Sequence, residues 1–192
     1  MKKIVILLLL VLGLSACKSD ALTKKELFEN DYVSFKETEH VFEKEDINKA
    51  IEKLVTGSGI LVFAFNPNIR DCPYCDEALP IMNEVAIALE IDTISYIDIY
   101  NDRTNNSYQY QLLYNYLSNV GNPNVIDDIS LELIENTKII VPDVYVIKDG
   151  KILAHHIALL KNEENQYIRN LSVSQREEVY NIYYDMFSLL LE

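Results

Sequence analysis

Apolar and polar positions along the chain follow two patterns: the helical spacing of amphipathic helices and the continuous apolar runs of buried strands. Continuous apolar runs predict strands at 60–65 and 93–100, and a similar run interrupted early by Pro142 predicts a strand at 138–147. Helical spacing of apolar residues predicts helices over 45–56, 75–90 and 108–118 and a last helix that begins at Ser174. A short strand is also expected at 31–35.

The C-terminal part contains the strongest turn signal in the chain. Asp149-Gly150 is typical of a tight hairpin and predicts a returning strand at 151–158, and Ser174 and Glu177 have the spacing of a capping box. Strands that alternate with helices and end in a hairpin predict an α/β fold, with a mixed central sheet and helices on both faces. No internal repeat or second domain is visible.

The first residues have the organisation of a bacterial lipoprotein signal peptide, which we assign to 1–16. Lys2 and Lys3 precede an apolar run that is too short to cross a bilayer comfortably as a helix but is typical of a signal peptide. The run ends in Leu14-Ser15-Ala16-Cys17, which resembles the lipobox, whose cysteine is lipidated and becomes the mature N-terminus. An ordinary cleaved signal with a chance cysteine is the alternative.

This assignment predicts the organisation of the rest of the chain. Residues 17–30 form a polar tether and 31–192 form the domain, which is held by the lipid on Cys17 at the outer face of the bacterial cytoplasmic membrane. The sequence leaves sorting to an outer membrane open, because Lys18 does not settle it. With Cys17 lipidated, the remaining two of the three cysteines form a pair, as expected of an exported protein.

Charge excludes one large class of partners. The chain has 17 Lys and Arg against 30 Asp and Glu, a formal net charge of −13. Nucleic-acid binding requires clustered cations to contact phosphates. We therefore expect no nucleic-acid partner.

The candidate chemistry lies in Cys72-Pro73-Tyr74-Cys75, at the start of the helix predicted over 75–90. Two thiols with this spacing can face each other across one helical turn. The partial positive charge and free N–H groups of a helix N-terminus stabilise a thiolate, so Cys72 is the expected nucleophile. Cys75 is then placed to attack the mixed disulfide and release the product.

Two other interpretations of the cysteine pair remain open. A structural disulfide is one, although closing so short a loop removes little chain entropy. A zinc site is the other, but structural zinc takes four ligands and there is no second cysteine pair. His155 and His156 are adjacent on a predicted strand and point to opposite faces, which favours one core and one surface histidine. We expect no metal site.

The pattern around the motif resembles the thioredoxin family over about 47–190, most of the chain. An apolar strand leads into the cysteine motif, Pro80 follows Cys75 by five residues where thioredoxins carry a helix-kinking proline, and Val141-Pro142 begins a strand as the family's cis-proline does. The run from Val144 to Ile152 is similar to the family's terminal hairpin.

The resemblance implies roles for particular residues. The Val141–Pro142 bond is expected to be cis and to lie beside the dithiol, and the backbone of Val141 is expected to pair with an extended substrate segment. With Pro73 and Tyr74 of the motif, these residues form the expected substrate-binding surface. No cofactor is needed.

Three departures from the family pattern stand out. Asp71 replaces the tryptophan that usually precedes the motif, and Phe63 occupies the strand position that usually holds a buried acid. Asp76 or Glu77, acting through water, are the candidates to accept the proton of the resolving thiol instead. The segment 101–137 is a long insertion relative to the family minimum.

The sequence thus predicts a membrane-anchored, extracytoplasmic thiol–disulfide oxidoreductase that exchanges disulfides with protein substrates and with a separate redox partner. Whether it oxidises, reduces or isomerises is left open. A non-catalytic accessory lipoprotein with the same fold, for example one associated with bacteriocin export, is the alternative, and a thiol-bound metal chaperone is a third.

Overall fold

A computed structural model of the chain describes residues 21–119, 138–157, 160, 162 and 168–192. The described strands form one sheet in the order β1–β3–β2–β4–β5. Both β1 and β2 run parallel to β3, whereas β4 runs antiparallel to β2 and to β5. The strand bounds are β1 (Phe42–Lys44), β2 (Gly59–Ala64), β3 (Ile94–Asp98), β4 (Asp143–Lys148) and β5 (Lys151–Ile157).

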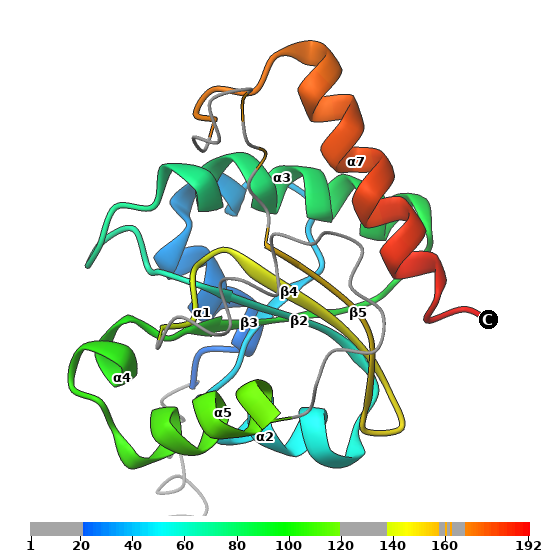
Figure 1. Cartoon of the computed structure of the whole chain (residues 1–192). Coiled ribbons are helices and arrows are strands. Elements are labelled where there is room, and N and C mark those ends of the chain that lie inside the picture. The colour runs from blue at the N-terminus through cyan, green and yellow to red at the C-terminus, as the bar shows by residue number, and fades with distance from the viewer. Residues whose placement is uncertain (1–20, 120–137, 158–159, 161, 163–167) are drawn as a thin grey trace, which may run out of the picture.

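Helices cover both faces of this sheet. Helices α3 (Pro73–Ala88) and α7 (Val173–Ser188) lie together on one face, and α2 (Ile47–Thr56) and α5 (Tyr108–Asn119) lie on the other (Figure 1). The central strand β2 is therefore buried on both sides, and its residues from Ile60 to Ala64 have no exposed area. The predicted α/β class, a thioredoxin-like mixed sheet between two helical layers, is confirmed.

The N-terminal part of the domain differs from the prediction. The expected strand at 31–35 is wrong, because this segment is the end of helix α1 (Lys24–Asp31) followed by the 3-10 turn η1 (Val33–Phe35). A capping box starts α1: the N–H of Glu26 donates to the Thr23 hydroxyl, and the N–H of Thr23 donates to the Glu26 carboxylate. The folded domain thus begins before the predicted boundary at residue 31, and α1 occupies part of the expected tether.

Two further elements were not predicted. Strand β1 has three residues and pairs Phe42 with Ile94 at the edge of the sheet. The other is helix α4 (Tyr100–Thr104), which precedes α5 in the described part of the long insertion at 101–137; α5 itself confirms the helix predicted over 108–118. The expected signal peptide 1–16, Cys17 and residues 120–137 lie outside the described residues.

Two local predictions need correction. The N-cap of α7 is Ser172, whose hydroxyl accepts from the backbone of Gln175 in a capping box, so Ser174 lies inside the helix. His155 and His156 do point to opposite faces, toward Tyr145 and Tyr183 respectively. Both histidines are nevertheless completely buried, because each face of β5 is covered, and neither is a surface residue.

Aromatic side chains attach α1 and η1 to the sheet. The ring of Phe28 stacks on Phe42 with centroids 4.7 Å apart and makes edge contacts with Phe35 and Tyr96, each at 5.2 Å. Phe28 has no exposed area, and Tyr32 retains 3%. Helix α1 is therefore part of the hydrophobic core, even though most of its other residues are polar.

His40 gives this aromatic cluster a pH-dependent stability. Its Nδ1 accepts from the N–H of Phe42 and its Nε2 lies 3.1 Å from Glu29 Oε1. Burial lowers the pKa of His40, outweighing the opposing effect of Glu29, and the charge of Lys25 lowers it further. The unfolded chain therefore binds this proton more readily, and the stabilisation present above pH ~6.5 is lost as the pH falls through the folded-state pKa.

Replacing His40 by Gln removes this titration. We expect the free energy of unfolding of the wild type to exceed that of His40→Gln by a margin that is constant above pH ~6.5 and shrinks below it. Urea unfolding at a series of pH values between about 5 and 8 measures that margin. A margin that does not change with pH contradicts the prediction.

Candidate functional site

Cys72 and Cys75 lie at the start of α3, after the loop that follows β2. Cys72 is the N-cap residue and Pro73 occupies the first helical turn, where its missing N–H costs no helical hydrogen bond. The carbonyl oxygen of Cys72 accepts from the N–H groups of Cys75, at 2.8 Å, and of Asp76, at 3.1 Å. The motif is thus at the positive end of the helix dipole, as expected.

The two sulfur atoms are joined in a disulfide, with Cα atoms 5.2 Å apart. The cysteines differ in exposure: Cys72 keeps 5% of its surface and Cys75 keeps none. A thiol or disulfide arriving from solvent can therefore reach the bond only from the Cys72 side. This asymmetry matches the predicted roles of an attacking Cys72 and a resolving Cys75.

The loop between β2 and Cys72 is fixed to the end of α1. The side-chain amide of Asn66 donates to Asp31 at 2.7 Å, and the amide of Asn68 donates to the backbone carbonyls of Asn30 and Asp31. Asp31 also forms an ion pair with Lys44 on β1. Sequence analysis missed this network, which holds the segment that carries the motif.

The predicted proline lies at the same end of the sheet as the disulfide. Phe63 of β2 pairs with Asp143 of β4, so the residues after Phe63 and the residues before Asp143 emerge together where α3 begins. The Val141–Pro142 peptide bond is cis, as the resemblance implied, and both residues are buried. Val141 retains 7% of its surface.

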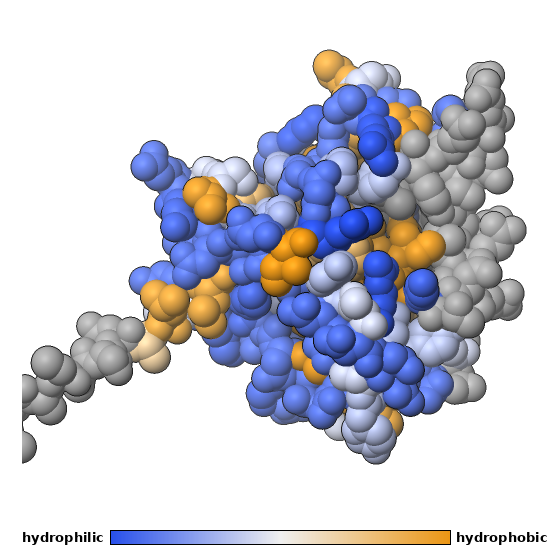
Figure 2. All heavy atoms as spheres, turned by 90° about the vertical axis from the view of Figure 1, so that its left-hand side faces the viewer, coloured by the Kyte–Doolittle hydropathy of each residue, from blue (hydrophilic) through white to orange (hydrophobic). Residues whose placement is uncertain are grey.

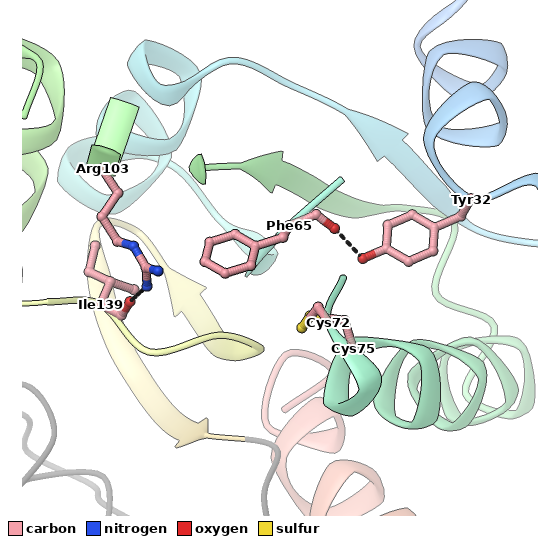
Figure 3. The surroundings of a disulfide bond; sticks show 6 residues. All are labelled: Tyr32, Phe65, Cys72, Cys75, Arg103 and Ile139. Carbon is pink, nitrogen blue, oxygen red and sulfur yellow. Dashed lines mark hydrogen bonds between the residues drawn. A yellow bond between two sulfur atoms is a disulfide. The ribbon is translucent and has the colours of Figure 1, made fainter. Parts of the chain in front are cut away.

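Phe65 lies close to the disulfide, between two side chains that sequence analysis did not identify (Figure 3). The hydroxyl of Tyr32 donates to the carbonyl oxygen of Phe65 at 2.6 Å. The guanidinium of Arg103 lies 4.5 Å from the centroid of the Phe65 ring and donates to the carbonyl oxygen of Ile139 at 2.9 Å. No sequence spacing links these residues, because they come from α1, α4 and the segment before β4.

The segment before α7 reaches across to the start of α3. The guanidinium of Arg169 lies 5.5 Å from the centroid of the Tyr74 ring, and its Nε donates to the Tyr74 hydroxyl at 3.3 Å. The N–H of Leu171 donates to Glu77 at 3.2 Å. Tyr74, a predicted substrate contact, is therefore held beside an exposed cation.

The two acids proposed as proton acceptors have different surroundings. Burial raises the pKa of Asp76, and the nearby charges of Asp71 and Glu77 raise it further. Glu77 accepts a hydrogen bond from the N–H of Leu171. A carboxylate with a raised pKa takes up a proton more readily, so the raised pKa of Asp76 favours Asp76 as the acceptor.

Phe63 occupies the β2 position that usually holds a buried acid in the thioredoxin family. Its ring is buried and makes an edge contact with Tyr145, with centroids 5.8 Å apart. Its strand partner Asp143 is an acid that sequence analysis missed. Asp143 accepts from the Tyr145 hydroxyl at 3.1 Å and pairs with His155, and burial raises its pKa. Asp143 and Tyr145 line a small cavity together with Tyr114 of α5, so these two side chains face α5 rather than α3.

The sheet end that carries the site is predominantly hydrophilic, with apolar side chains in separate small groups (Figure 2). In the described parts of the chain, no group of three or more His, Cys, Asp or Glu side chains is arranged to hold a metal ion. The described helices include none with the length and apolar character to span a membrane. Comparison of the chain with models of known protein families and with curated proteins found no match.

Proposed function

We propose that this protein is a thioredoxin-like thiol–disulfide oxidoreductase that exchanges disulfides with protein substrates through Cys72 and Cys75. The observation that carries the proposal is a disulfide at the first turn of α3, in which only Cys72 retains any exposed area. The cis Val141–Pro142 bond at the same end of the sheet adds support. Neither feature requires a cofactor.

The exchange proceeds in two displacements. In the reduced protein, the Cys72 thiolate attacks one sulfur of a substrate disulfide; a Cys72–substrate bond forms and the other substrate sulfur leaves as a thiolate. The Cys75 thiolate then attacks the sulfur of Cys72, which forms the Cys72–Cys75 disulfide and releases the second substrate thiolate. Two electrons pass to the substrate, and the reverse sequence oxidises a substrate dithiol.

The surroundings supply what each displacement needs. The helix N-terminus favours the Cys72 thiolate by about 0.3–1 kcal/mol or more. Asp71 opposes that thiolate, and the exposed Arg169, whose guanidinium feels the charge of Asp71, offsets it. Cys75 must lose its proton in a buried place, and Asp76 is the acceptor that we assign to it.

The setting that fits this chemistry is extracytoplasmic, because disulfides persist outside the reducing cytoplasm. We propose that a lipid on Cys17 holds the domain at the outer face of the membrane. Its partners are then exported proteins with dithiols or disulfides and a separate redox protein that resets the pair. The net charge of −13 gives no reason to expect a nucleic-acid partner.

A second function is favoured by one observation. Cys72 is only 5% exposed, which suits a permanent disulfide in a non-catalytic accessory lipoprotein that binds a partner protein. The two functions differ in how easily the disulfide is reduced, because an enzyme must cycle and a scaffold need not.

Redox titration separates these functions. The purified chain carrying Cys17→Ser, in which only the motif thiols titrate, is equilibrated with dithiothreitol or glutathione buffers and alkylated. For the oxidoreductase we expect a potential between about −270 and about −120 mV, the range of catalytic dithiols. A potential below about −300 mV, typical of structural disulfides, contradicts the proposal and supports the accessory protein.

A further inference from the structure

The segment that leads to cis-Pro142 is held at one residue, Ile139, by two side chains from the insertion. The N–H of Ile139 donates to the hydroxyl oxygen of Tyr110 at 3.1 Å. The carbonyl oxygen of Ile139 accepts from Nη1 of Arg103 at 2.9 Å, as Figure 3 shows. Ile139 is only 5% exposed. Both backbone polar groups of this residue are thus satisfied by α4 and α5 instead of by the sheet.

Each of the two side chains is itself fixed. The guanidinium of Arg103 is half-buried and lies over the ring of Phe65, 4.5 Å from its centroid. This cation–π contact restricts the position of the guanidinium group. Tyr110 is 4% exposed and stacks on Tyr114 with centroids 6.4 Å apart. Because Arg103 and Tyr110 are already fixed by these contacts, they lose little side-chain entropy when they bind the backbone groups of Ile139.

The contact with Phe65 ties this arrangement to the redox site. Phe65 directly follows β2, and its carbonyl oxygen accepts from the Tyr32 hydroxyl at 2.6 Å. On the far side of Pro142, strand β4 is fixed by its pairing with β2 from Asp143 onward. The backbone of Val141 is therefore fixed on both sides, by the contacts to Ile139 before it and by the pairing of β4 with β2 after it.

We propose that Arg103 and Tyr110 are positioning residues, which hold the N–H and the carbonyl group of Ile139 so that the backbone of Val141 can pair with an extended peptide segment of the substrate. The proposal rests on the proposed disulfide exchange and on the substrate pairing that the thioredoxin resemblance implies, and it adds the role of Arg103 and Tyr110 in that pairing. Pairing through main-chain groups tolerates many substrate sequences. The backbone of Val141 must be ordered before the substrate binds, because ordering it during binding would weaken the affinity. The insertion thus acts in substrate recognition.

The test compares a peptide substrate with a small dithiol. Turnover of a self-quenched fluorescent peptide disulfide, with dithiothreitol as electron donor, gives KM and kcat. The rate at which dithiothreitol alone reduces Cys72–Cys75 and the redox potential serve as readouts that involve no peptide strand. All variants carry Cys17→Ser.

Tyr110→Phe keeps the buried ring and removes only the acceptor, and Arg103→Gln removes the charged donor. We expect each variant to raise KM for the peptide about threefold to tenfold, as for loss of one hydrogen bond. We expect kcat, the dithiothreitol rate and the potential to stay within twofold. Arg103→Lys, which retains a donor, should recover part of the loss, and Tyr108→Phe, at a residue of α5 that is 69% exposed, is the matched control.

An unchanged KM in both Tyr110→Phe and Arg103→Gln overturns the proposal. So does a dithiothreitol rate that falls as much as peptide turnover, because the defect then lies in the disulfide itself. If the wild type turns over the peptide and only the effect of the variants is missing, the proposed function stands. If the wild type does not exchange with either reagent, the proposed function fails as well.

Discussion

Cys72→Ser is expected to abolish disulfide exchange, with turnover reduced by at least about a thousandfold. Cys72 is the only cysteine of the pair with exposed area, and a serine hydroxyl in its place supplies no thiolate to attack a substrate sulfur. Without it, the completely buried Cys75 has no route to the substrate. The measurement is reduction of the fluorescent peptide disulfide by dithiothreitol in the Cys17→Ser background.

Cys75→Ser is the informative counterpart. Cys72 can still attack, but the resolving displacement is lost, so we expect a mixed disulfide between Cys72 and the substrate to accumulate. Non-reducing electrophoresis followed by mass spectrometry detects that adduct. Activity that survives unchanged in both variants would rule out the mechanism, and an adduct that forms on Cys75 in Cys72→Ser would reverse the two roles.

The second large effect concerns stability. Phe28→Ala is expected to lower the free energy of unfolding by about 3–5 kcal/mol, the usual cost of removing a buried phenyl ring. The ring is completely buried and contacts aromatic groups on η1, β1 and β3. Such a loss is a large part of the ~5–15 kcal/mol that stabilises an ordinary domain.

Urea unfolding measures this loss, and Leu27→Ala is the matched control. Leu27 is the neighbouring apolar residue on α1 and is 38% exposed, so its truncation should cost clearly less. If Phe28→Ala lowered the free energy of unfolding no more than Leu27→Ala does, α1 would not be part of the cooperative domain.

The central elements were predictable because their signals are local. A continuous apolar run identified β2, Asp149-Gly150 identified the β4–β5 hairpin, and the spacing of Cys72 and Cys75 placed both at one helical turn. In each case the residues that determine the structure are adjacent, or nearly adjacent, in the sequence.

The N-terminal region was not predictable in the same way. Helix α1 buries Phe28 and Asp31 among mostly polar residues, so it has no apolar stripe to reveal it. The N-cap of α7 was ambiguous, because Ser172 with Gln175 and Ser174 with Glu177 both fit the capping-box pattern. The structure selects Ser172.

The surroundings of the disulfide depend on distant contacts. Arg103 and Tyr110 meet Ile139 across separations of 36 and 29 residues, and Tyr32 meets Phe65 across 33. Single polar residues of this kind carry no periodicity, so only the folded chain reveals which backbone groups they satisfy. The insertion was visible as extra length, but its contact with the segment before Pro142 was not.

The early start of α1 has a consequence for the reach of the proposed lipid anchor. Only residues 18–23 separate Cys17 from Lys24, where the helix begins. Fully extended, six residues span roughly 20 Å. If Cys17 carries the proposed lipid, the domain stays in a thin layer next to the lipid headgroups, where it would meet polypeptides emerging from the bilayer sooner than proteins that diffuse freely beyond it.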